Sequence, residues 1–290
     1  MGIADLIRLV SLAAIWGSSF IFMKILAPVL GPIMTACLRV TIAGSTLIAY
    51  FYLTKLEVDW KANWKHYLVI AILNGSIPFT LFAYAALHIP AGLSAILNAT
   101  APHFGALLAA IFLADKLTTL KMLGLFLGLV GVSLIALKGG LAMDQFGYLG
   151  ILACLFAAFC YGLVGVYLKK YCANLKPMAI AGSSQFLAGM VLLPLALTTT
   201  TINGVIDLKI IITILCFSLL CSGLAFVIYY RLVANIGPSK ALTVTFLTPV
   251  FGLLWGVLFL GEVLTFKVLI GCVIIIIGTT LVLYKKKDKV

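Results

Sequence analysis

Long apolar stretches alternate with short polar segments along the whole chain. A helix needs about 20 apolar residues to cross the roughly 30 Å hydrocarbon core of a bilayer. Each stretch therefore predicts one membrane-spanning helix, and ten are expected. They cover residues 5–26, 33–54, 66–88, 91–113 and 118–137 in the first half of the chain, and 147–168, 178–200, 208–232, 239–260 and 265–284 in the second.

The second half of the chain repeats the first, at a spacing of 147 residues in the later part of each half and 145 in the earlier part. We therefore divide the chain into two five-helix repeats, 1–141 and 142–290. Because five is an odd number, the second repeat enters the membrane inverted, an arrangement typical of secondary transporters. The matched pairs include Pro102 and Pro249, Asp115 and Glu262, and Gly131 and Gly278 at a spacing of 147, and Trp16 and Tyr161, and Lys24 and Lys169 at a spacing of 145.

The composition supports this fold class, an all-α integral membrane protein with ten transmembrane helices in two inverted five-helix repeats. Apolar residues make up 64% of the chain and charged residues 10%, and the mean hydropathy is +1.23. Soluble domains are roughly half apolar and a quarter charged, so the excess must face lipid. The basic residues that give the formal net charge of +12 lie between the apolar stretches. They therefore indicate membrane topology and not a nucleic-acid partner.

The distribution of Lys and Arg predicts the orientation. Of the 20 basic residues, 15 fall on the side of the two termini, and the other side has only Lys24, Arg39, Lys138, Lys209 and Lys267. Basic residues concentrate on the cytoplasmic side. We expect a multi-pass protein of the inner or plasma membrane with both termini in the cytoplasm.

Several classes of chemistry lack their residues. The seven cysteines form no Cys-x-x-Cys pair and no cluster with His, which predicts packing roles and no metal site. No G-x-x-x-x-G-K-[ST] loop is present, so neither ATP nor any other cofactor is expected. The eight acidic residues do not cluster with His, which argues against a membrane-embedded lipid- or polyprenyl-modifying enzyme.

Two sets of motifs carry a family resemblance. Trp16-Gly17-Ser18-Ser19-Phe20 lies in the first span and Arg39 early in the second, and the two matched proline-containing spans end in Asp115 and Glu262, each followed by Leu-Thr. In these motifs the chain resembles the EamA-type branch of the drug/metabolite transporter superfamily. The resemblance implies a ten-helix carrier of amino acids or other small metabolites, often working outward. The chain departs from the family pattern at His103, where an apolar residue is common, and at Asp115, where Glu is favoured.

Polar residues at mid-membrane depth are candidate ligands, because they are costly there. His103 lies near the middle of the fourth span, where it would bind a substrate carboxylate, relay a coupling proton or simply pack as a neutral ring. Pro102 frees the carbonyl of Asn98 and Pro249 that of Thr245, since proline lacks an N–H. We expect each repeat to have a broken helix there, as transporters have around their substrate, or else a plain packing kink.

Other candidates are less symmetric. Pro78 frees the carbonyl of Asn74 in the third span, but its counterpart at 225 is Ala, so this break is expected in the first repeat only. Arg39 either snorkels to the outer surface or binds an anionic group. Trp16 and Tyr161 are too deep for an interfacial aromatic belt, so they either line a cavity or pack in the core.

The sequence thus favours a secondary transporter that exports amino acids or similar small metabolites or drugs by alternating access around a midplane cavity. Its expected partners are a small-molecule substrate and the lipid bilayer, with His103 the candidate for proton coupling, and it would be a monomer or homodimer. The alternatives are the membrane-embedded enzyme and a channel-like accessory protein, which would pass substrate far faster than a carrier does.

Overall fold

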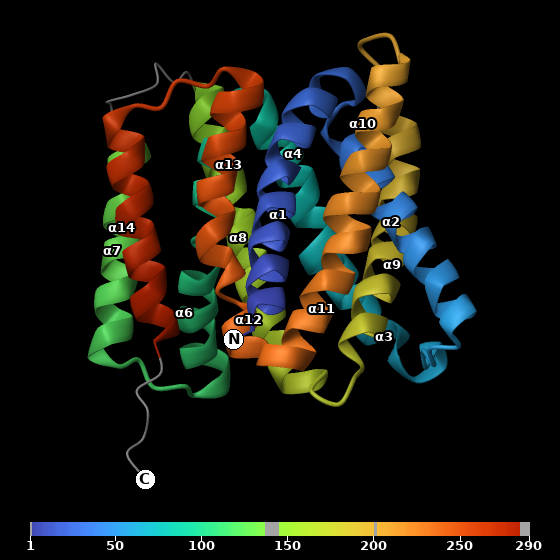
Figure 1. Ribbon diagram of the computed structural model, residues 1–290, viewed down its shortest axis with the longest axis horizontal. Coiled ribbons are helices and arrows are strands. Elements are labelled where there is room, and N and C mark those ends of the chain that lie inside the picture. Colours follow the sequence, from blue (N-terminus) through green and yellow to red (C-terminus); the bar gives the residue numbers. More distant parts are fainter. Residues whose placement is uncertain (1, 137–144, 200–201, 285–290) are drawn as a thin grey trace.

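The computed structural model describes residues 2–136, 145–199 and 202–284, and the elements in these ranges are all helices (Figure 1). They form nine helical segments that are long and apolar enough to cross a membrane, three of them made of consecutive elements, and a shorter apolar helix, Val244–Leu260, provides the tenth span. The predicted ten-helix membrane fold is therefore confirmed. The boundary expected at 141/142 lies in 137–144, outside the described residues.

Each repeat contains the same succession of helices. In the first repeat these are α1 (Ile3–Leu30), α2 (Pro32–Thr54), α3 (Trp60–Ile70) with η1 (Ala71–Ser76) and α4 (Ile77–His88), α5 (Ala91–Asn98) with α6 (Ala101–Leu113), and α7 (Thr119–Ala136). In the second they are α8 (Gln145–Tyr171), α9 (Pro177–Thr199), α10 (Leu208–Ser218) with η2 (Leu219–Leu224) and α11 (Ala225–Ile236), α12 (Pro238–Ala241) with α13 (Val244–Leu260), and α14 (Phe266–Leu283).

The second helices of the two repeats pack against each other, and so do the fifth helices. The helix α2 lies beside α9 at one edge of the bundle, and α7 lies beside α14 at the other (Figure 1). Small residues permit the second contact: a Cβ added at Gly124 would lie 2.6 Å from the carbonyl oxygen of Gly278, and one added at Gly278 would lie 2.8 Å from that of Gly124. Glycine lets membrane helices approach this closely, so the duplicated glycines hold the two repeats together.

The two ends of the bundle are distinguished by the links between helices. We call the end with the N-terminus, where α2 leads to α3 and α6 to α7, the terminal end, and the opposite one, where α1 meets α2 and α4 meets α5, the far end (Figure 1). At the far end Gly31 alone separates α1 from α2, with φ of 74°, a conformation that glycine adopts readily. This tight link makes α1 and α2 neighbours.

The third span of each repeat contains a short π-helical segment at the same place. The segments η1 and η2 are both six residues long and lie 148 positions apart (71 to 219 and 76 to 224). In the first repeat Pro78 follows the segment as the second residue of α4, but the second repeat forms its own without proline. The expectation of an asymmetric break was wrong, because the π segment forms without a proline in the second repeat.

The fourth spans are also interrupted, at different places. In the first repeat α5 ends at Asn98 and α6 begins at Ala101, so the break lies directly before Pro102. In the second repeat α13 runs uninterrupted from Val244 through Pro249, and the break lies earlier, between α12 and α13. The expected break at Pro249 is therefore corrected: the helix accommodates this proline in its interior.

Candidate functional site: a cavity between the two repeats

A cavity of about 540 Å³ lies in the middle of the bundle, lined by helices of both repeats. Its size is that of ordinary small-molecule sites, about 300–1,000 Å³. The broken and π-helical segments bring their polar side chains to it. Of the seven residues that the sequence suggested as ligands, six line this cavity: Trp16, Arg39, Asn74, Asn98, Tyr161 and Thr245.

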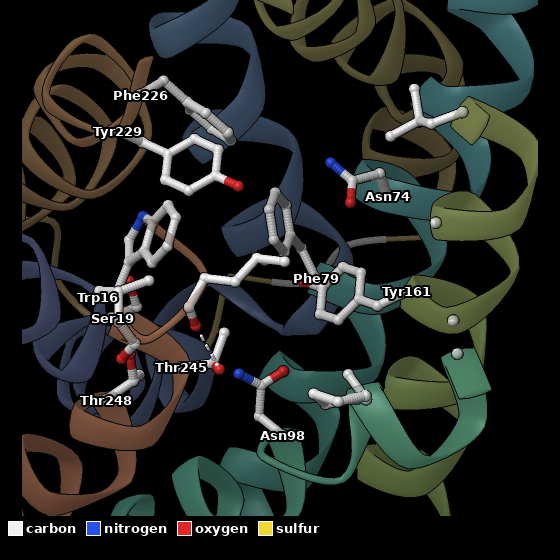
Figure 2. Close-up of a pocket in the computed structure, with 18 of the residues that line it drawn as sticks. Trp16, Ser19, Asn74, Phe79, Asn98, Tyr161, Phe226, Tyr229, Thr245 and Thr248 are labelled. Carbon is white, nitrogen blue, oxygen red and sulfur yellow. Dashed lines mark hydrogen bonds between the residues drawn. The ribbon is translucent and has the colours of Figure 1, made fainter. Parts of the chain in front are cut away.

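Figure 2 shows how the labelled side chains surround the cavity. Trp16 and Tyr229 lie on the side formed by α1 and α11, and Asn74 and Tyr161 lie opposite them. The Trp16 and Tyr229 ring centroids are 5.5 Å apart. Eight of the lining residues are aromatic and most of the others are apolar, which suits a ligand with a flat apolar body.

Polar atoms interrupt these apolar walls. The hydroxyl oxygen of Ser19 and the side-chain oxygen of Asn98 are buried and have no hydrogen-bond partner among the described residues. The hydroxyls of Thr245 and Thr248 donate to carbonyl oxygens of their own chain segment, those of Leu242 at 2.8 Å and Val244 at 3.0 Å. Unpaired buried polar groups cost free energy, so Ser19 and Asn98 are positioned to be satisfied by a ligand.

Sequence reasoning missed most of the aromatic lining. For Phe20 a usable signal was present, because it lies four residues after the candidate Trp16 and so on the same face of a helix. The helix α11, which contributes Phe226, Tyr229 and Tyr230, contained no candidate. The missed lining residues are Ser19, Phe20, Phe79, Phe82, Phe226, Tyr229, Tyr230 and Thr248.

His103 lies outside the cavity, and so do Pro78 and Pro249. The His103 side chain is buried and fills the space left by glycines of α7 and α14. A Cβ added at Gly278 would lie 3.0 Å from the His103 Nε2 atom, and one added at Gly128 would overlap the ring. In this conformation the imidazole contacts neighbouring helices and not the cavity.

The cavity extends toward one end of the bundle. Its lining reaches the terminal end at Leu113, Lys169 and Leu242, the residues nearest to that end. None of the described residues in the links at the far end contributes to the lining. The described residues therefore form a cavity directed to the terminal end and covered at the far end.

Glu262 makes the covering contacts at the far end. Its two carboxylate oxygens accept hydrogen bonds from the backbone N–H groups of Ala91, at 2.5 Å, and Gly92, at 3.0 Å. These are the first N–H groups of α5, which a carboxylate satisfies well. Close by, the Lys24 ammonium donates to the carbonyl oxygen of Ile89 at 3.0 Å. Two charged side chains thus fix the α4–α5 link.

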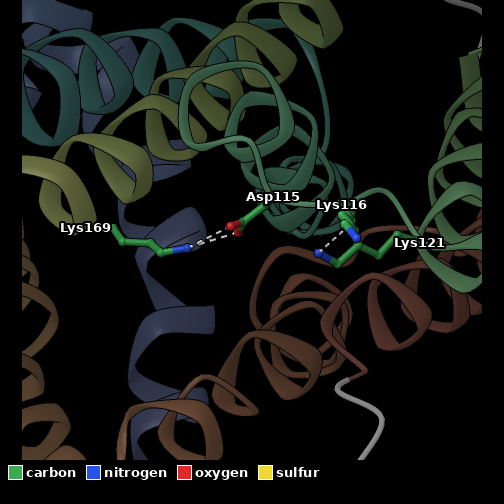
Figure 3. Close-up of polar contacts among 4 residues, drawn as sticks. All are labelled: Asp115, Lys116, Lys121 and Lys169. Atoms are coloured by element: carbon green, nitrogen blue, oxygen red, sulfur yellow. Dashed lines mark hydrogen bonds and ion pairs between the residues drawn. The ribbon is translucent and has the colours of Figure 1, made fainter.

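The matched residues at the terminal end make a different contact. Asp115, the counterpart of Glu262, accepts from the Lys169 ammonium at 3.0 and 3.2 Å (Figure 3). Lys169 is itself the counterpart of Lys24. Both side chains are partly exposed, 61% for Lys169 and 38% for Asp115, so the pair contributes little, about 0–1 kcal/mol. Lys24 and Glu262 therefore hold the far end closed. The matched pair, Lys169 and Asp115, contributes only weakly at the terminal end.

Comparison with known proteins agrees with this architecture. The model of the EamA-like transporter family matches the chain twice, over residues 6–137 and 148–284. The uncharacterized transporter YoaV of Bacillus subtilis (strain 168) is 24% identical over 275 residues, covering 94% of each chain. A probable amino-acid metabolite efflux pump of Salmonella typhimurium is 24% identical over 273 residues, 91% of this chain and 89% of that protein. A solved crystal structure shares the fold with a TM-score of 0.66 at 16% identity, covering 97% of this chain and 96% of the other.

Proposed function

The chain belongs to the EamA-like transporter family, and on this basis we propose that it is a secondary carrier that exports amino acids or similar small metabolites by alternating access. The observation that carries the proposal is the difference between its two ends. Glu262 and Asp115 occupy matched positions in inverted repeats, yet Glu262 binds the start of a helix and Asp115 binds a lysine. Glu262 therefore holds the far end closed, whereas the matched Asp115 leaves the terminal end open.

Inverted repeats can exchange these roles. In the alternative state the far end opens, Glu262 leaves Ala91 and Gly92, and Asp115 binds the start of α12, where Pro238 and Ser239 are the matched residues. The cavity would then be covered at the terminal end. Exchange of two packings between pseudo-symmetric halves is how such transporters move a site from one side to the other.

The direction of transport follows from the distribution of basic residues. The positive-inside pattern assigns the terminal end to the cytoplasm. A cavity directed to that end would load from the cytoplasm, which suits an exporter. A relative described as a probable amino-acid metabolite efflux pump supports this direction and substrate class. Proton coupling through His103 is not part of the proposal, since its ring lies outside the cavity.

A counterflow experiment tests the proposal. Proteoliposomes preloaded with unlabelled amino acid are diluted into trace labelled amino acid, and uptake above equilibrium is measured. A carrier accumulates label transiently, because each unlabelled molecule that leaves the liposome brings the binding site to the outside. There the site binds labelled substrate and carries it in. Monotonic equilibration would indicate a channel, and chemical change of the labelled compound would indicate an enzyme. Either result would refute the proposal.

A further inference from the structure

The guanidinium of Arg39 is a buried cation at the edge of the cavity. Its side chain extends from α2, the residue is 5% exposed, and it contributes to the cavity lining. Its Nε donates to the Ser222 hydroxyl on η2 at 2.7 Å. Within the described ranges no carboxylate forms an ion pair with it. A buried charge without a counter-ion is costly. Either an anionic partner from outside the chain offsets this cost, or the uncompensated charge has another role.

Two aromatic rings contact the guanidinium. Its Cζ atom lies 3.7 Å from the centroid of the Phe79 ring and 4.6 Å from that of Phe217. Cation–π contacts of this kind offset part of the burial cost. With Nε bonded to Ser222, the two terminal nitrogens remain, and among the described residues neither donates a hydrogen bond. Two adjacent N–H groups on one edge match the two oxygens of a carboxylate.

The rest of the cavity lining favours an anion. Among the described residues that line it there is no Asp or Glu, and the other cation there, Lys169, is already paired with Asp115. Amide and hydroxyl groups of Asn74, Asn98 and Ser19 provide neutral contacts only. A cationic ligand would find no counter-ion here, whereas a dianion such as a phosphate monoester would find one available guanidinium. The charge balance therefore suits a single carboxylate.

We propose that Arg39 binds the carboxylate of the transported molecule, and that this molecule is a small carboxylate with a flat apolar body packed among the aromatic walls. This proposal rests on the proposed carrier function and narrows its substrate class. Trp16, Tyr161 and Tyr229 would contact the apolar body. Ser222 is a positioning residue, because its hydroxyl bonds Nε and orients the edge of the guanidinium toward the ligand.

Three probes with one phenyl body and different charges separate the alternatives: 3-phenylpropionate, phenylalanine and phenethylamine. The melting temperature of the purified protein in nanodiscs is measured against the concentration of each, since a ligand of the folded state raises it by mass action. We expect 3-phenylpropionate and phenylalanine to stabilise the protein and phenethylamine to have no effect. Stabilisation by phenethylamine, or by none of the three, would overturn the carboxylate assignment.

Variants localise the effect. Arg39→Gln should weaken the binding of 3-phenylpropionate by about tenfold or more, because two charge-assisted hydrogen bonds are lost. Arg39→Lys keeps the charge but not the planar edge, and should fall between wild type and Arg39→Gln. Ser222→Ala should weaken binding without changing which probe binds. The matched control is Arg231→Gln, at an exposed arginine, which should bind as wild type does. Equal affinity in wild type and Arg39→Gln would reduce Arg39 to packing.

A second measurement covers the case in which the Arg39 variants do not fold. Phenylglyoxal modifies arginine, and mass spectrometry of the wild-type protein reports adducts at each one. 3-Phenylpropionate should protect Arg39 and leave Arg231 unprotected; equal labelling with and without it would refute the assignment. The carrier proposal fails separately, through loss of counterflow, whereas a failed carboxylate assignment leaves counterflow of other substrates intact.

Discussion

Removing the charge of Glu262 should open the far end of the protein. In Glu262→Gln one oxygen remains, so one hydrogen bond to the start of α5 is lost and the other becomes neutral. Hydrogen bonds to charged groups contribute about 1.5–3 kcal/mol and neutral ones about 0.5–1.5 kcal/mol. The expected loss is about 2.5–4.5 kcal/mol of stabilisation of the far-end-closed state, about 1.5–3 from the lost bond and about 1–1.5 from the bond that becomes neutral. At about 1.4 kcal/mol per factor of ten, this shifts the equilibrium by about 60-fold to 1,600-fold.

Distance measurements between spin labels report this shift. Labels are introduced through noncanonical amino acids, because the chain has seven native cysteines. A pair at Leu87 and Val263, which are 37% and 82% exposed, spans the far end, and a pair at the exposed Lys116 and Lys240 spans the terminal end. If the wild type is about 99% closed at the far end, about 40–95% of the Glu262→Gln molecules should show the opened distance there. The terminal-end pair should shorten in the same proportion.

The matched control is Glu57→Gln. Glu57 is also a carboxylate paired with a basic residue, Lys176, at 3.6 Å, but its side chain is 92% exposed. Exposed pairs contribute little, so its distance distributions should equal those of wild type. Unchanged distributions in Glu262→Gln at both ends would refute the role of this carboxylate as the far-end closure.

Three further substitutions test the surrounding contacts. Gly256→Ala should act in the same direction as Glu262→Gln, since its Cβ would overlap the Glu262 carboxylate, whereas Gly165→Ala has nothing within 4 Å of its Cβ and should leave the far-end distance unchanged. His103→Ala should lower the melting temperature through lost packing and leave probe affinity within about twofold of wild type; a loss of affinity would return His103 to the site. Asp115→Asn should keep the terminal end open even with ligand bound, because it removes the carboxylate that matches Glu262, and a shortened terminal-end distance would contradict this.

The sequence could predict the spans and several polar or amphipathic cavity residues because both depend on local composition. Ten apolar stretches require ten helices in lipid, and Trp16 and Asn98 are polar or amphipathic groups at a depth where lipid contact is costly. The placement of His103 was beyond this reasoning. The helix is interrupted between Asn98 and Ala101, so helical periodicity does not fix the direction of His103 relative to Asn98. Which of them faces inward is decided by tertiary packing.

The π segments were equally hidden, because 219–224 contains no proline and no composition that separates it from an α-helix. Their symmetry appears only in the structure. Both lie beside the cavity: η1 contributes Asn74 and η2 contributes Cys221 to its lining, and the neighbouring Ser222 accepts a hydrogen bond from Arg39. A π turn inserts one residue and rotates the side chains that follow it, and such segments are frequent at functional sites. The duplicated distortion thus places one residue from each repeat in the cavity wall.

The closed states of the two ends cannot be equally stable, because one of the matched positions is a proline. Glu262 receives two N–H groups, from Ala91 and Gly92, but the matched positions for Asp115 are Pro238, which has no N–H, and Ser239. Closure of the terminal end therefore gains one hydrogen bond where closure of the far end gains two. An empty carrier should rest with its cavity toward the terminal end, and bound substrate must favour the other state by its differential affinity.

Pro238→Ala tests this asymmetry directly. The substitution supplies the missing N–H and should favour closure of the terminal end by about tenfold, the value of one hydrogen bond to a charged group. The spin-label pair at Lys116 and Lys240 should shorten, and the shortening should vanish when Asp115→Asn is added, because the new N–H then lacks its charged acceptor. If the shortening persists in the double variant, the proline acts through helix geometry and not through Asp115, and the hydrogen-bond account of the asymmetry is wrong.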